Sequence, residues 1–134
     1  QSQSTSNPTS ISQWAAEAAL NGDQACITPM LDAFKARHRF VVDGLNALPG
    51  FKCVDSGGAF YAFPDVRAAI MNLLARDVIE APTDIAFSEY LLESADVAVV
   101  PGSAFGAEGY IRLSFATSQA NLEKALKRIA QALA

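Results

Sequence analysis

The chain has 134 residues, 51% of them hydrophobic, so it holds one domain's worth of core-forming residues and is unlike a disordered segment. Its formal net charge of −4 comes from 14 acidic and 10 basic residues without a basic run, which argues against binding to nucleic acids or anionic membranes. Two distant cysteines, Cys26 and Cys53, and the single histidine, His38, have no metal-ligand spacing, so we expect no metal site.

The first residues and the scarcity of cysteine indicate a cellular compartment. The start, Gln-Ser-Gln-Ser-Thr-Ser, has neither the charged nor the apolar region of a secretion signal, and no apolar stretch is long enough to span a bilayer. Few cysteines fit a reducing environment. We therefore predict a cytoplasmic protein. Because the chain begins with Gln1 and not with Met, we interpret it as an excised piece of a longer protein.

The N-terminal part is predicted to be extended and then helical. Residues 1–9 are polar, and Pro8 disfavours helical geometry at the residue before it. Ser10 and Gln13 have the spacing of a capping box, and an alanine-rich stretch follows until Asn-Gly at 21–22. We therefore expect a first helix that begins at Ser10.

A longer helix is predicted for residues 28–48. Thr28 suits the N-cap, proline follows at the first helical position, and apolar residues recur at helical spacing until Pro-Gly at 49–50. His38 lies in the middle of this helix. Since a general base needs an oriented partner and none is visible, we expect His38 to be a surface or packing residue.

The next segment reads as a hairpin followed by two helices. Residues 51–54 and 59–63 favour strands, and the Asp-Ser-Gly-Gly between them favours a turn. Asp65 precedes a short apolar pattern, residues 66–74, that indicates a helix. Thr83 and Asp84 begin another helix, and residues 97–100 form a short buried strand.

A glycine-punctuated loop then runs into a strand that carries one charge. Residues 101–116 read Pro-Gly-Ser-Ala-Phe-Gly-Ala-Glu-Gly-Tyr-Ile-Arg-Leu-Ser-Phe-Ala. Because strand side chains alternate, Ile111, Leu113 and Phe115 share one face, and Arg112 lies on the other between a tyrosine and a serine. A solvated strand face is the common reading of such an arginine, but a glycine-rich loop before it favours a site for a planar carboxylate.

The last element is a scaffold helix, and the order of elements gives the fold class. Thr117 or Ser118 caps a helix whose apolar residues, from position 122 to 133, lie on one side. Helices and strands in this order predict an α+β fold, with a small, mainly antiparallel sheet covered by helices.

Three motifs in this order resemble the pyridoxal-phosphate-dependent aminotransferases of fold type I, the aspartate aminotransferase superfamily. They are Ser-Asn-Pro-Thr-Ser, Gly-Gly-Ala-Phe-Tyr, and Pro-Gly-Ser-Ala-Phe-Gly followed by Tyr-Ile-Arg-Leu-Ser. The resemblance implies that residues 1–134 are a single domain, the small C-terminal domain of such an enzyme, with residues 1–9 leading in from a missing large domain. That domain is itself α+β, which agrees with the element order.

The same resemblance implies roles for particular residues. Arg112 matches the arginine that binds the substrate α-carboxylate. Gly58 and Phe60 lie on the strand that passes beside the substrate pocket in the family; Phe60 or Tyr61 would line the pocket, and core packing explains Phe60 at least as well. The parent protein would be an aminotransferase, most nearly an aspartate aminotransferase. It would act on amino-acid and 2-oxo-acid substrates with pyridoxal phosphate as cofactor, and it would form a homodimer.

What the chain lacks shapes the remaining expectations. None of its four lysines stands in the Ser-x-x-Lys context of the family, so the Schiff-base lysine would lie upstream. We expect no catalytic and no cofactor-binding residue in this chain, no bound pyridoxal phosphate and no activity by itself. Two alternatives remain: another fold type I enzyme, such as a different aminotransferase or a lyase, and a non-catalytic carboxylate-binding module.

Overall fold

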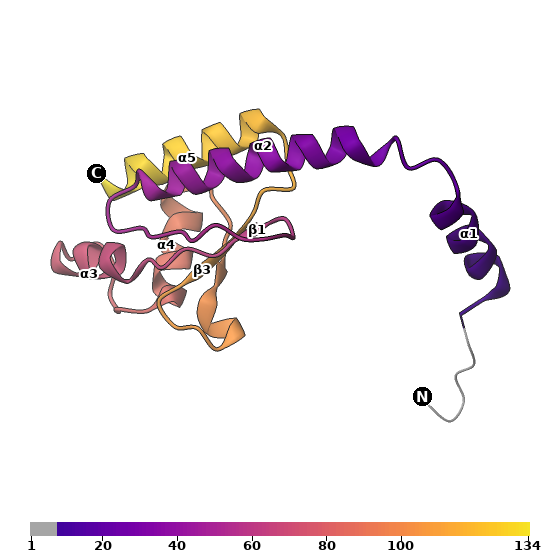
Figure 1. The fold of residues 1–134 in the computed structure, drawn as a ribbon. Coiled ribbons are helices and arrows are strands. Elements are labelled where there is room, and N and C mark those ends of the chain that lie inside the picture. Colours follow the sequence, from indigo (N-terminus) through magenta and orange to yellow (C-terminus); the bar gives the residue numbers. More distant parts are fainter. Residues whose placement is uncertain (1–7) are drawn as a thin grey trace, which may run out of the picture. The chain divides into compact units, whose positions relative to one another are not determined.

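The computed structural model describes residues 8–134 (Figure 1). Contacts between residues divide the chain into two compact units, a first that ends at Ala33 and a second that spans Phe34–Ala134. Most of the predicted extended segment, residues 1–9, lies outside the described residues. Over residues 8–134, no helix combines the length and the apolar character needed to cross a membrane.

The first unit contains helix α1 (Ser10–Asn21), whose N-cap differs from the prediction by one residue. The Thr9 hydroxyl accepts the backbone N–H of Ser12 at 3.4 Å, so Thr9 and not Ser10 is the cap. The Gln13 amide donates to the Pro8 carbonyl at 2.7 Å instead of completing a capping box. No residue of α1 is buried, and three large apolar side chains are exposed, namely Ile11, Trp14 and Leu20.

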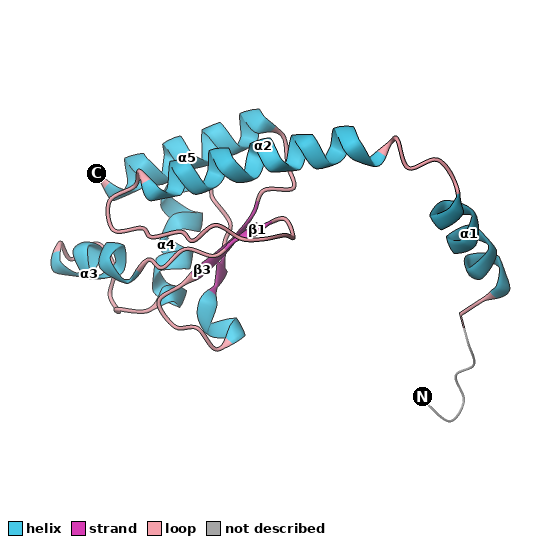
Figure 2. Ribbon diagram, viewed as in Figure 1, coloured by secondary structure: helices cyan, strands magenta, loops and turns pink. Residues whose placement is uncertain are grey.

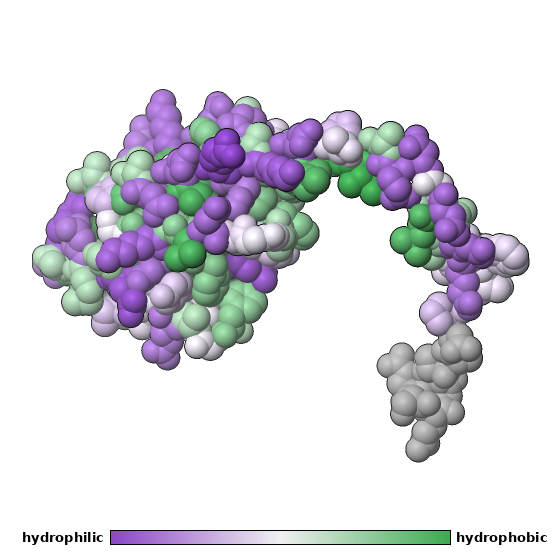
Figure 3. Space-filling view, in the orientation of Figure 1, coloured by the Kyte–Doolittle hydropathy of each residue, from purple (hydrophilic) through white to green (hydrophobic). Residues whose placement is uncertain are grey.

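Helix α2 (Ile27–Asn46) begins one residue before its predicted cap and ends two residues early. The backbone N–H of Ile27 donates to the Gln24 carbonyl at 3.0 Å, which starts the helix there. In the N-terminal part of α2 the large apolar side chains are exposed, and Figure 3 shows apolar atoms gathered on that part of its surface. In its C-terminal part they are buried, with Val41, Val42 and Leu45 in the core of the second unit.

A three-stranded antiparallel sheet lies in the second unit, and its strand order is β1-β3-β2 (Figure 2). The strands are β1 (Tyr61–Ala62), β2 (Val100–Pro101) and β3 (Ile111–Ser114). Helices α3 (Arg67–Ala75), α4 (Asp84–Ala95) and α5 (Gln119–Leu133) complete the unit. The predicted α+β class, a small antiparallel sheet with helices, is confirmed.

One face of β3 forms the centre of the core. Ile111, Leu113 and Phe115 are at most 6% exposed, as their alternation predicted. They pack in one cluster with apolar residues of α2, α3, α4 and α5. At Gly44 of α2 an added Cβ would lie only 2.5 Å from a methyl group of Leu126 of α5, so these two helices are in close contact. The opposite face of β3 is therefore the one left for a site.

The predicted hairpin of residues 51–63 is largely absent. Strand β1 pairs with β3 instead, and the bridge formed by residues 51–54 joins Lys52 to Asp65, beyond the end of the predicted second strand. The reason is the side chain of Asn46 at the end of α2, which donates to the Cys53 carbonyl at 2.9 Å and accepts the Cys53 N–H at 2.8 Å. Since Asn46 satisfies both backbone groups of Cys53, no neighbouring strand is needed there.

The remaining helix starts agree with the sequence. Thr83 caps α4 by accepting the backbone N–H of Ala86 at 3.1 Å, and Ser118 caps α5 by accepting that of Asn121 at 3.2 Å. Asp65 accepts the backbone N–H of Arg67 at 3.0 Å at the start of α3. These local signals fix where each helix meets the sheet.

Candidate functional site

Two aromatic rings flank the guanidinium of Arg112 on the outer face of the sheet. Its Cζ atom lies 4.4 Å from the ring centroid of Tyr61 on β1 and 4.4 Å from that of Phe105. Phe105 is the last residue of η1 (Gly102–Phe105), a 3₁₀ helix in the glycine-rich loop between β2 and β3. Two rings, one 51 and the other 7 positions before Arg112 in the sequence, thus meet at one cation.

The rings around Arg112 belong to a larger aromatic face. Phe63 lies 6.1 Å from Phe105, edge to face, and stacks on Tyr110 at 5.4 Å. Tyr61, Phe63 and Tyr110 share the outer side of the sheet because they occupy alternate positions on β1 and β3 or their extensions. Phe105 is half exposed and Phe63 is 37% exposed. We call Tyr61, Phe63, Phe105 and Tyr110 the aromatic face.

Arg67 and Arg128 form ion pairs with acidic residues, and Arg112 does not within residues 8–134. Arg67 forms an ion pair with Asp65, and Arg128 forms one with Asp96 at 3.2 Å. Within residues 8–134, the Arg112 guanidinium has neither an ion pair nor a side-chain hydrogen bond, although it is partly buried. Ring stacking occupies the flat surface of a guanidinium and leaves its edge of N–H donors available, which matches the two oxygens of a carboxylate.

A buried acid holds the loop that carries Phe105. Asp84, the first residue of α4, is only 3% exposed, and its Oδ2 atom accepts the backbone N–H of Ser103 at 2.6 Å. Burial raises the pKa of Asp84, but hydrogen bonds from the backbone and hydroxyl of Ser103 and from the backbone of Asp84 and Gly109 together outweigh it, and the result is a pKa below the usual value. Asp84 is therefore a charged anchor for η1.

We expect this anchor to appear in the acid dependence of stability. Because the pKa of Asp84 is lower in the folded protein than in the unfolded chain, its stabilising effect is complete above pH about 4 and is lost as the pH falls through the lowered pKa. Asp84→Asn removes that effect, so the free energy of unfolding should fall less steeply below pH 4. Urea unfolding at several pH values measures both slopes.

Comparing the unsubstituted protein with Asp84→Asn isolates the effect of Asp84, because the other acidic residues contribute equally to the acid sensitivity of both. Arg67 lowers the pKa of Asp65 through a side-chain hydrogen bond, which contributes to acid sensitivity with or without the substitution. If the free energy of unfolding fell equally steeply below pH 4 in both proteins, the role assigned to Asp84 would be contradicted.

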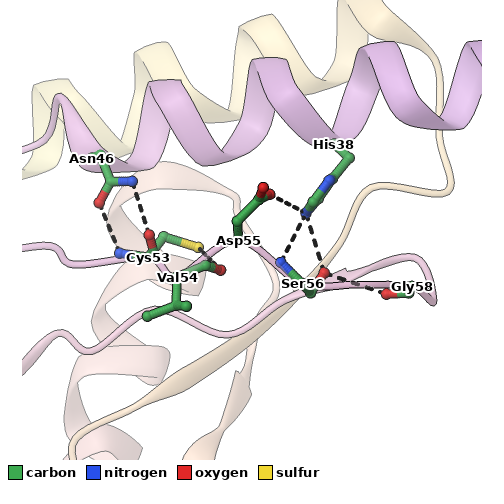
Figure 4. Close-up of polar contacts among 7 residues, drawn as sticks. All are labelled: His38, Asn46, Cys53, Val54, Asp55, Ser56 and Gly58. Atoms are coloured by element: carbon green, nitrogen blue, oxygen red, sulfur yellow. Dashed lines mark hydrogen bonds and ion pairs between the residues drawn. The ribbon is translucent and has the colours of Figure 1, made fainter.

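A second polar cluster, around His38, is structural (Figure 4). The His38 Nε2 atom lies 3.1 Å from the Ser56 hydroxyl and 3.4 Å from Asp55 Oδ1, and its ring packs 5.3 Å from that of Phe115. Serine and aspartate meet the same ring nitrogen, so they cannot form the relay of a catalytic triad, which uses both nitrogens. Burial raises the pKa of the nearby Cys53 thiol, which disfavours a reactive thiolate.

The other predicted site residues, Phe60 and Gly58, do not contact Arg112 in the structure. Phe60 is 42% exposed, and its ring lies 4.5 Å from that of Tyr61, the residue that does contact Arg112. Gly58 lies in the exposed turn before it, where its carbonyl accepts the Ser56 hydroxyl at 3.3 Å. Their role in lining a pocket stays a prediction. Tyr61, the alternative to Phe60 as a pocket-lining residue, contacts Arg112, whereas Phe105 and Asp84 were not in the predicted site.

The four lysines of the chain are not part of the aromatic face. Lys35, Lys52, Lys124 and Lys127 are exposed, and none of them contacts its rings. In the part of the chain that the structure describes, no group of three or more His, Cys, Asp or Glu residues is placed to hold a metal ion.

Comparison with known proteins gives the family. The family model described as aminotransferase class I and II matches residues 1–129. The chain belongs to this family. The motifs around Arg112 predicted the same family, so that prediction is confirmed.

Individual members of the family share both sequence and fold with the chain. It is 60% identical over 133 residues to the aspartate/prephenate aminotransferase of Nitrosomonas europaea, and the match covers 99% of this chain and 34% of that protein. The crystal structure of the Rhizobium meliloti aspartate aminotransferase superposes with a TM-score of 0.85 at 45% identity, covering 98% of this chain and 33% of the other.

A third relative was solved with a carboxylic acid. The structure of the Thermus thermophilus aspartate aminotransferase with maleate gives a TM-score of 0.81 at 41% identity, covering 98% of this chain and 32% of the other. The chain thus spans about a third of the length of the relatives it matches.

Proposed function

We propose that this chain is the substrate-binding small domain of an aminotransferase and that Arg112 binds the α-carboxylate of the substrate. The observation that supports this most directly is the partly buried guanidinium of Arg112, stacked on two rings and unpaired with any acid within residues 8–134. A carboxylate that accepts two parallel N–H···O hydrogen bonds would satisfy the N–H donors along the edge of the Arg112 guanidinium. The family membership supplies the amino-acid and 2-oxo-acid substrates.

The contribution of this domain to the reaction is orientation. With its carboxylate held by Arg112 on a strand, the substrate loses rotational freedom, and its α-carbon is presented in a fixed direction to the rest of the enzyme. The aromatic face excludes water from one side of the guanidinium, which strengthens the ion pair. A lysine cannot replace this arginine geometrically, because an ammonium offers no planar fork.

The remaining parts of the proposal concern the parent protein. Pyridoxal phosphate would be bound by residues outside this chain, and the isolated chain would be inactive. Aspartate is the proposed amino acid, since the relatives above are named aspartate aminotransferases, one of them aspartate/prephenate aminotransferase. A cytoplasmic homodimer is the proposed form of the parent protein, as for the family that the motifs resemble.

The test of this function is Arg112→Lys in the full-length enzyme that carries the domain. We expect the Michaelis constants for aspartate and for its 2-oxo-acid partner to rise together, by roughly 10- to 100-fold, because one bidentate, charge-assisted contact to both substrates is lost. Steady-state kinetics with each substrate varied in turn measures the change.

The matched control is Arg128→Lys on α5. Arg128 is also a partly buried arginine, but its partner is Asp96 at 3.2 Å. We expect its kinetics to equal those of the unsubstituted enzyme. Unchanged Michaelis constants in Arg112→Lys would contradict the proposed function, and a rise for only one of the two substrates would contradict a contact to the carboxylate that both share.

A further inference from the structure

We propose that Asp84 is a positioning residue for the carboxylate site: it fixes η1, η1 fixes the ring of Phe105, and that ring fixes the guanidinium of Arg112. This inference rests on the proposed function of Arg112. It concerns a residue on α4 that no motif marks and whose carboxylate bonds to the Ser103 backbone and not to Arg112.

The first step is the contact between Asp84 and η1. The first N–H groups of a helix have no acceptor within it, and Ser103 lies in the first turn of η1. The Asp84 carboxylate accepts the Ser103 N–H at 2.6 Å and is therefore a cap supplied by another helix. Asp84 also lies in the first turn of α4, where the helix dipole favours a negative charge. Its burial, at 3% exposed, keeps this contact away from water.

Asp84 is the side chain that holds the middle of this loop. Backbone bonds fix the two ends: the Gly102 N–H donates to the Tyr110 carbonyl at 2.7 Å, and the Val66 N–H donates to the Gly109 carbonyl at 2.9 Å. Among residues 8–134, the cap from Asp84 is the hydrogen bond that ties η1 itself to a helix. Removing its charge leaves the ends in place and loosens the segment that carries Phe105.

The second step runs from η1 to the arginine. The backbones of the two residues that flank Arg112 are held differently: Tyr61 lies on β1, which pairs with β3, whereas Phe105 lies on η1, and its ring also packs against that of Phe63 at 6.1 Å. Both ring centroids lie 4.4 Å from the Arg112 Cζ atom. If η1 shifts, the guanidinium loses one of its two aromatic walls and samples further rotamers. The fork is then less often oriented for a carboxylate.

The test measures carboxylate binding directly, with maleate as the probe and calorimetry on the full-length enzyme. We expect Asp84→Asn to raise the dissociation constant for maleate about tenfold, as when one charged hydrogen bond is lost. Asp96→Asn, the same change at the other end of α4, is the control and should leave the constant unchanged. An unchanged constant in Asp84→Asn would overturn the proposal.

A double-mutant cycle separates positioning from simple stabilisation. Phe105→Leu alone should raise the maleate constant, and adding Asp84→Asn to it should cause little further change, because the ring through which Asp84 acts is gone. If the fold-increases in the maleate dissociation constant from the two single substitutions multiplied in the double variant, Asp84 would not act through Phe105 and the proposal would be overturned. Should Asp84→Asn not fold, Asp84→Glu keeps the charge and displaces the carboxylate by one methylene; it should raise the constant as well, and an unchanged constant there would also overturn the proposal.

Arg112→Lys is the reference for both the single-variant titrations and the double-mutant cycle, and it is measured with maleate as well. If it leaves maleate binding unchanged, the proposed function of Arg112 fails. If it weakens binding while Asp84→Asn does not, only the positioning role fails.

Discussion

Alanine at Gly102 is expected to displace the loop beside Arg112 and to destabilise the fold by roughly 3 kcal/mol, the range of overpacked buried sites. Gly102 is buried at the start of η1, and an added Cβ would clash with the Ala107 carbonyl oxygen and lie 2.7 Å from both the Cβ and the carbonyl oxygen of Tyr110. Two of these neighbours are backbone atoms, so no side-chain rotation relieves the clash. The hydrogen bond from the Gly102 N–H to the Tyr110 carbonyl would lengthen or break when the loop is displaced.

Two measurements follow from this displacement. Urea unfolding should show the loss of stability, and calorimetry on the full-length enzyme should show maleate affinity falling at least tenfold, because Phe105 moves with η1. Gly57→Ala is the control: an added Cβ there meets no atom within 4 Å, and both quantities should stay near those of the unsubstituted protein. Normal maleate binding by a folded Gly102→Ala protein would show that the loop does not shape the site.

Strand β3 shows what the sequence can predict. Its side chains alternate, and the two-residue period alone separates the buried Ile111 and Leu113 from Arg112 on the other face. The helix starts at Thr83 and Ser118 were equally predictable, because a hydroxyl that caps a helix acts on residues two or three positions away. Both kinds of signal are local, and in each case the structure bears them out.

Contacts made over longer distances could not be predicted in this way. Residues 51–54 have a strand-like composition, but the Asn46 side chain occupies the backbone of Cys53, and this bond joins the end of a helix to a loop. Propensity describes how a segment behaves by itself, so it gives no sign that a side chain from α2 will take the place of a partner strand.

In the candidate site too, features with a local sequence signal could be identified, and those that depend on contacts between distant segments could not. Arg112 could be singled out from the sequence because a charged residue interrupts an apolar pattern after a glycine-rich loop; its role in binding stays a prediction. Tyr61 was named only as a residue that could line a pocket, and Phe105 was not named, because the two lie 51 and 7 positions away and meet Arg112 only when β1 and η1 are in place. Asp84 left no such signal, because an acid in the first turn of α4 already suits the helix dipole and nothing local indicates a further role. Its partner, Ser103, lies on another element.

The largest effect on stability is expected at Phe87, whose truncation to alanine should cost about 3–5 kcal/mol. Phe87 is fully buried on the inner side of α4, and its ring lies 6.0 Å from that of Phe51. Alanine there leaves a cavity among side chains that cannot collapse without moving α4 or the segment after α2. Urea unfolding of the chain, with the midpoint and slope compared with the unsubstituted protein, measures the loss.

The control lies two residues away on the same helix. Ile85 is half exposed, so Ile85→Ala removes a similar apolar side chain with little cavity and should change the free energy of unfolding by less than about 1 kcal/mol. Phe87 sits one turn from Asp84, which makes α4 the element that joins the core to the site. At temperatures where Phe87→Ala remains folded, maleate binding by the full-length enzyme should be weakened. A variant that loses stability yet binds maleate normally would show that η1 keeps its position without a rigid α4.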